Sequence, residues 1–148
     1  MSKTDKFEFD FLRLMFNGVA LTNFASTAGT TALWAALCTA DPTDAGSTAN
    51  EGGYAQYTRV QTDRSTGGTG WAVSSGTGAA VASASPVGNI DFPQNTSTST
   101  GTFSFMALYP SSAAQASSAI YVATVTPNIN FSQNVTPRLT TASSITED

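Results

Sequence analysis

Short runs of β-branched, aromatic and alanine residues recur along this chain of 148 residues, and turn-forming residues bound each run. Runs of about four to eight residues between Gly, Pro, Asn, Asp and Ser are typical of β-strands. They lie at residues 31–39, 54–62, 70–76, 87–92, 102–109 and 118–125, with weaker ones at 128–132 and 137–146. This spacing predicts an all-β domain, a β-sandwich or Greek-key barrel of seven to eight short antiparallel strands.

Two kinds of segment refine this prediction. The run "TALWAALCT" at 31–39 is apolar on both alternating faces, which is typical of a central strand or one buried at a subunit contact. The segments "STGGTG" (65–70), "SGTGAAVASASP" (75–86) and "QNTSTSTGT" (94–102) have low sequence complexity. We expect these three segments to be loops on a rigid scaffold.

The N-terminus predicts one short helix. Asp5 and Glu8 have the spacing of a capping box, and Asn17-Gly18 is a stop signal, so the helix is expected over residues 6–17. The chain then divides into a helical docking segment at 1–18 and a β-sandwich domain at 19–148. The apolar residues of the helix spread around its axis, so a second molecule is expected to cover them. The predicted subunit or capsid contact comprises Phe7, Phe9, Phe11, Leu12, Met15 and Phe16.

Charge and hydropathy exclude two classes of partner. Six Lys and Arg against ten Asp and Glu give a net charge of −4, whereas nucleic-acid binding requires clustered basic residues. No uncharged apolar run reaches the roughly 18 residues of a membrane span. Charges within "MSKTDKFEFDFLR" also interrupt any signal-peptide core. We expect binding neither to nucleic acid nor to a membrane.

Catalytic chemistry has few candidates in this sequence. The absence of histidine excludes Ser-His, Cys-His and His-metal arrangements. The internal carboxylate pairs Asp41/Asp44 and Asp63/Asp91 are the remaining candidates for an acid–base pair. In "TADPTDAG" the Asp41-Pro42 dipeptide and Gly46 are typical of a turn, which offers too few oxygens for calcium. We therefore expect no enzyme activity, catalytic residue, metal or cofactor.

Cys38 and three aromatic residues have structural interpretations. Cys38 lies in an apolar run with no cationic neighbour in sequence, so it is expected to be a small buried hydrophobe. Tyr54, Tyr57 and Trp71 could stack on sugars. We favour core positions, with Tyr57 and Arg59 on one face of a strand and Tyr54 on the other.

Six short motifs, in order, resemble a family of small structural proteins of tailed-bacteriophage virions. They are "LRLMFNGVA" (12–20), "LWAALCTADPTDAG" (33–46), "GGYAQYTRV" (52–60), "GGTGW" (67–71), "NIDFP" (89–93) and "SSITED" (143–148). The motif at 52–60 carries two residues more than the family pattern, and residues 94–118 depart from it.

The resemblance implies an all-β virion component, assembled in the cytoplasm of the bacterial host. We favour a capsid decoration or cement protein, a homotrimer on the major capsid protein, because the chain lacks the repeat stalk of a fibre. The alternative is a tail fibre or baseplate-associated protein that binds other tail proteins and takes part in host attachment.

Overall fold

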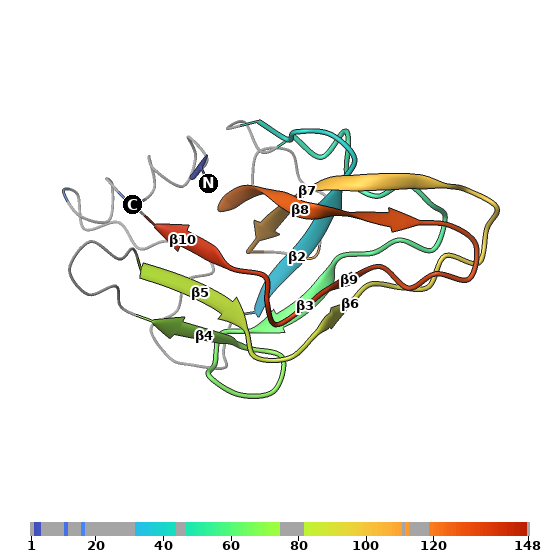
Figure 1. Ribbon diagram of the computed structural model, residues 1–148. Coiled ribbons are helices and arrows are strands. Elements are labelled where there is room, and N and C mark those ends of the chain that lie inside the picture. Colours follow the sequence, from blue (N-terminus) through green and yellow to red (C-terminus); the bar gives the residue numbers. More distant parts are fainter. Residues whose placement is uncertain are drawn as a thin grey trace.

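The computed structural model describes residues 2–3, 11, 16, 32–43, 47–74, 82–110, 112 and 119–147. The described part of the chain contains ten strands (Figure 1). They are β1 (Ser2–Lys3), β2 (Ala32–Cys38), β3 (Val60–Asp63), β4 (Trp71–Ser74), β5 (Ala82–Pro86), β6 (Ile90–Asp91), β7 (Gly101–Tyr109), β8 (Tyr121–Phe131), β9 (Arg138–Leu139) and β10 (Ile145–Glu147). This confirms the predicted all-β fold.

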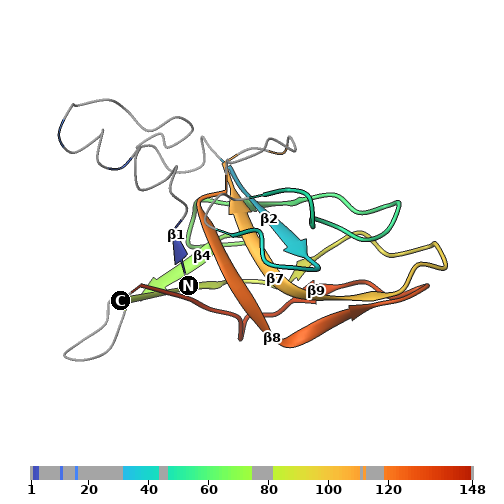
Figure 2. The same cartoon turned by 90° about the horizontal axis from the view of Figure 1, so that it is seen from above.

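The strands form three antiparallel sheets. The largest has the order β1-β8-β7-β2-β3, and the smaller ones have the orders β10-β5-β4 and β6-β9. In Figure 1, β7 and β8 lie above the small sheets that contain β4, β5, β6 and β9. Both chain ends lie at the same end of the molecule, as Figure 2 also shows.

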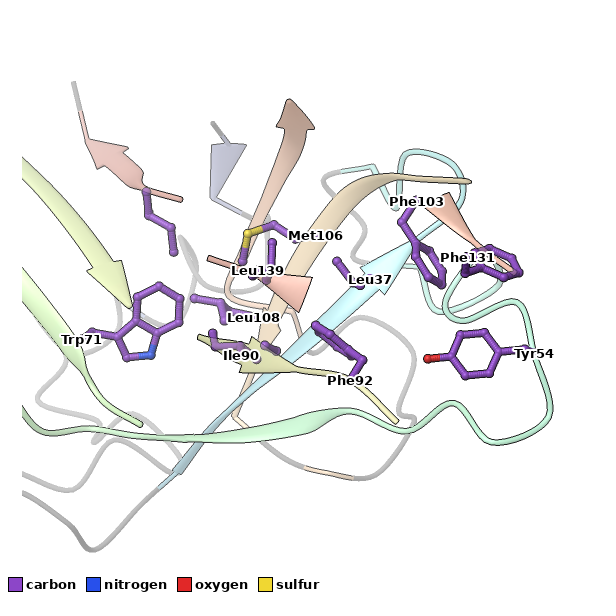
Figure 3. Close-up of a cluster of buried hydrophobic side chains, with 12 residues drawn as sticks. Leu37, Tyr54, Trp71, Ile90, Phe92, Phe103, Met106, Leu108, Phe131 and Leu139 are labelled. Atoms are coloured by element: carbon purple, nitrogen blue, oxygen red, sulfur yellow. The ribbon is translucent and has the colours of Figure 1, made fainter. Parts of the chain in front are cut away.

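The main core lies between the large sheet and the two small ones (Figure 3). Leu37 and Leu108 from the large sheet meet Ile90 and Leu139 from the two-stranded sheet. Trp71 of β4 closes one end of this core, where its indole Nε1 donates to Thr62 Oγ1 at 3.0 Å. Burying each large apolar side chain contributes roughly 1.5–3 kcal/mol.

An aromatic cluster fills the opposite end of the core. The rings of Phe103 and Phe131 are 4.6 Å apart, and Tyr54 lies 5.5 Å from Phe131. Tyr57 stacks on Phe92 at 5.9 Å with an interplanar angle of 9°. Offset and tilted ring pairs of this kind add about 0.5–1.5 kcal/mol each beyond their buried area.

The second face of the large sheet is buried as well. Ala36 and Cys38 of β2 and Ala107 and Tyr109 of β7 are all fully buried on that face. Since β2 lies between β7 and β3, the prediction of a central strand at 31–39 is confirmed.

Several predicted element boundaries are wrong. Of the predicted strand at 54–62 only residues from Val60 onward are extended, because the chain turns at Tyr54–Tyr57 and both tyrosines enter the core. The runs at 118–125 and 128–132 form a single strand, β8, which continues through a register shift opposite Phe103 and Phe105. The run at 137–146 holds two separate strands, β9 and β10.

One expected loop contains a strand. Within residues 75–86 the alternating Ala and Ser of Ala82–Pro86 form β5, the central strand of its sheet. Its small residues carry little β-propensity, so pairing with β4 and β10 rather than local preference determines its conformation.

The predicted helix at 6–17 lies outside the described residues except for Phe11 and Phe16, which are both helical. Before it, Ser2 and Lys3 pair with Val122 and Tyr121 of β8.

The ring of Phe131 leaves no room for a side chain at Gly101. A Cβ at Gly101 would lie 2.5 Å from Phe131 Cζ, whereas a Cβ at Gly67 would have no heavy atom within 4 Å. We predict that Gly101→Ala lowers the free energy of unfolding by about 1–3 kcal/mol, as overfilling a core does. Urea denaturation measures this change. The matched control Gly67→Ala should lie within about 0.5 kcal/mol of the parent protein, and equal stabilities of the two variants would contradict the assigned contact.

Candidate functional site

The predicted contact residues of the N-terminal segment are only partly placed. Phe7, Phe9, Leu12 and Met15 lie outside the described residues. Phe11 is 47% exposed and Phe16 is 81% exposed. An exposed phenylalanine places a large apolar area in water, so these two side chains are candidates for contact with another molecule.

The stretch that begins at Asp41 is a turn, as predicted. Asp41 Oδ1 accepts a hydrogen bond from Thr43 N at 2.8 Å, and Thr43 has a positive φ of 61°. Ser47 N donates to Pro42 O at 2.8 Å and closes the loop. Asp44 lies outside the described residues, which contain no group of three or more side chains suited to a metal ion.

The two carboxylates of the second candidate pair, Asp63 and Asp91, bind different partners. Asp63 accepts a hydrogen bond from Thr69 Oγ1 at 2.8 Å. Asp91 forms a bidentate ion pair with Arg138, whose hydrogen bonds lower the pKa of the Asp91 carboxyl. Each carboxylate thus has its own partner and takes part in local structure.

Cys38 and the three aromatic residues are structural, as expected. Cys38 is fully buried, and desolvation raises the pKa of its thiol to about 12. Tyr54 donates its hydroxyl to Pro93 O at 2.6 Å, and Tyr57 accepts a hydrogen bond from Leu37 N at 2.7 Å. The expected alternation is wrong, because both tyrosines pack into one aromatic cluster.

A buried ion pair holds the segment after the turn against the large sheet. Arg59 Nη2 lies 2.7 Å from Glu51 Oε2, and their side chains are only 3% and 9% exposed. The Arg59 guanidinium also lies over the Tyr109 ring, 3.4 Å from its centroid. Sequence reasoning missed this contact, since a separation of eight residues across an irregular segment is not a recognised pairing pattern.

The Tyr109 hydroxyl is buried without a hydrogen-bond partner. It is the single side-chain polar atom in this situation among the described residues. Burial raises the pKa of Tyr109, so the group stays neutral at physiological pH.

Three loops meet at the end of the molecule away from the chain termini (Figures 1 and 2). We call residues 54–58, 93–100 and 132–136 the distal tip. Asn95 N donates to Val135 O at 3.0 Å, and Asn134 N donates to Asn95 O at 2.7 Å. Gln94 Nε2 donates to Asn134 O at 3.0 Å, and Thr96 N donates to Gln56 Oε1 at 3.4 Å.

The side chain of Asn95 organises this tip from within. It is fully buried, its Nδ2 donates to Ser99 O at 2.7 Å, and its Oδ1 accepts from both Ser97 N and Ser97 Oγ. A buried amide with these partners fixes the loop backbone at 95–99. Asn95 belongs to an "NTS" sequon, but its burial makes it a structural residue.

We predict that Arg59→Met costs about 3–5 kcal/mol of unfolding free energy, because it leaves the Glu51 carboxylate buried without its partner. Urea denaturation at pH 7 measures the loss. The double variant Glu51→Leu/Arg59→Met should recover part of it. Arg138→Ala, which breaks the half-exposed pair with Asp91, is the control and should shift the midpoint only slightly. A single Arg59→Met variant as stable as the parent would contradict the role of the pair.

No helix among the described residues is both long enough and apolar enough to cross a membrane.

Comparisons with known proteins identify the family. A search of curated proteins finds no match to the chain. The family model described as "Podophage GP4 fiber I protein gp80" matches residues 3–144. Since that match spans nearly the whole sequence, the chain belongs to the podophage GP4 fiber I protein gp80 family and is a structural protein of the phage virion.

Proposed function

We propose that this protein is a component of a tail fibre and acts without catalysis. The family match over residues 3–144 carries the proposal, because the family description names a fibre protein. The match thus favours the tail-fibre alternative over the capsid decoration role that the sequence analysis preferred. A sequence without histidine further supports a structural role.

A domain as small as this one is compatible with a place in a fibre. The sandwich has a continuous core from Trp71 at one end to the Phe103–Phe131 cluster at the other (Figure 3). Its stability therefore comes from its own packing and does not depend on a fibre stalk. A domain of this size buries roughly 68–70% of its unfolded surface. A compact domain of this kind can serve as one module among other tail proteins, which we propose as its partners.

We predict that antibodies against the protein label the tail of purified virions in electron micrographs, at few copies per particle. Particles that lack the protein should have intact heads and adsorb poorly to host cells. Quantitative mass spectrometry of virions measures the copy number. Labelling across the head, with copies comparable to those of the major capsid protein, would instead favour a decoration protein. So would early bursting of particles that still adsorb.

The N-terminal segment is our proposed attachment site to neighbouring subunits. Phe16 is 81% exposed, so replacing it removes little from the fold, whereas a contact between subunits would bury the ring. The homotrimer, which was expected for a capsid decoration protein, remains a prediction, and light scattering tests it against a subunit mass of 15.3 kDa.

We predict that Phe16→Ser impairs assembly and leaves the free energy of unfolding within about 0.5 kcal/mol of the parent value. Val73→Ser is the matched control, because Val73 is 74% exposed on β4 and lies outside the N-terminal segment. Analytical ultracentrifugation and incorporation into virions report assembly. Normal incorporation of Phe16→Ser, or equal loss in both variants, would contradict this assignment.

A further inference from the structure

The distal tip presents uncharged polar side chains to solvent. Residues 54–58, 93–100 and 132–136 include no Asp, Glu, Lys or Arg. Their exposed side chains are mainly amides and hydroxyls, among them those of Gln56, Gln94, Thr96, Gln133 and Asn134. Val135, 37% exposed, is the large apolar side chain that the described tip presents to solvent.

Two glutamine amides in this tip each form one hydrogen bond to a neighbouring loop. Gln56 directs its carbonyl oxygen toward the loop at 93–100, because that atom accepts from Thr96 N at 3.4 Å. Gln94 directs its amino group toward the loop at 132–136, because that group donates to Asn134 O at 3.0 Å. The remaining polar atoms, the Gln56 amino group and the Gln94 carbonyl oxygen, have no partner among the described residues. One donor and one acceptor thus lie on neighbouring loops.

This arrangement is prepared before any ligand binds. The buried Asn95 amide fixes residues 95–99, and Tyr54 ties the adjoining loop to Pro93 from inside the core. A surface that is already ordered loses little conformational entropy on binding, so weak hydrogen bonds contribute more to affinity.

Resting on the proposed role in a tail fibre, we infer that the distal tip binds a neutral polysaccharide on the host surface through Gln56 and Gln94. Each sugar hydroxyl both donates and accepts, which suits a surface that offers an amide donor on one loop and an amide acceptor on the next. A charged polymer would gain no attraction from a tip without charged residues. A protein partner is less well matched, because protein interfaces usually need buried aromatic or arginine anchors.

The position of the tip agrees with this inference. Both termini lie at the opposite end of the sandwich (Figure 1), so attachment through the N-terminal segment leaves the tip directed away from the attachment point. Several copies in one fibre would then act together, and avidity would compensate for weak single contacts.

The experiment measures binding of the fluorescently labelled full-length protein to cells of the strain on which the phage grows. Mild periodate treatment of the cells cleaves vicinal diols and should abolish binding, whereas proteinase treatment should leave it unchanged. The opposite pattern would identify a protein receptor and overturn the inference. Absence of binding to untreated cells would overturn it too, while labelling of the tail in virions would still support the fibre role.

Gln56→Glu tests the tip directly. The variant keeps an oxygen to accept from Thr96 N but replaces the outward amino donor by a charged acceptor. We expect the half-saturating concentration on cells to rise about tenfold, the loss expected for about one hydrogen bond. The control Gln61→Glu makes the same chemical change on the exposed side chain of β3 and should alter binding less than twofold. Equal binding by the two variants, at equal melting temperatures, would overturn the inference.

Discussion

The contact between Phe103 and Phe131 is the one on which most of this structure depends. Their rings, 4.6 Å apart, join β7 to the far half of β8 across the register shift between these strands. Tyr54 and Tyr57 pack against the same rings and thereby bring the irregular segment before β3 into the core. The space is so full that Gly53 and Gly101 each leave room for Phe131 only because they lack a Cβ.

The aromatic cluster also connects the core to the distal tip. Tyr54 reaches from the cluster to the carbonyl of Pro93, at the start of the loop that Asn95 organises. The order of the tip therefore depends on the packing of Tyr54 and Tyr57 at its base, since most of its other residues are polar with little apolar area to bury. Arg59 and Glu51 hold the other side of the same segment against Tyr109.

Local patterns in the sequence predict the parts of the fold that local physics determines. The all-β class, the central strand at 31–39 and the turn at Asp41 follow from alternation, double-sided apolarity and Asx chemistry. The strand β5 could not be predicted from its Ala and Ser residues, because pairing with two neighbours creates it. The irregular backbone at 54–59 could not be predicted from the sequence either, because tertiary burial of two tyrosines overrides strand propensity there. No local signal indicates the Glu51–Arg59 pair or the three loops of the distal tip, which meet only in the folded chain.

We propose a virion protein that attaches through its N-terminal end and recognises the host surface through the distal tip. Both proposed roles require that the protein is part of the tail. Cross-linking mass spectrometry of intact virions tests this claim directly, because Lys3 and Lys6 are the only lysines in the chain and both lie in the N-terminal segment. Amine-reactive cross-links from these lysines to other tail proteins are the predicted result. Cross-links from the same lysines to the major capsid protein would contradict it.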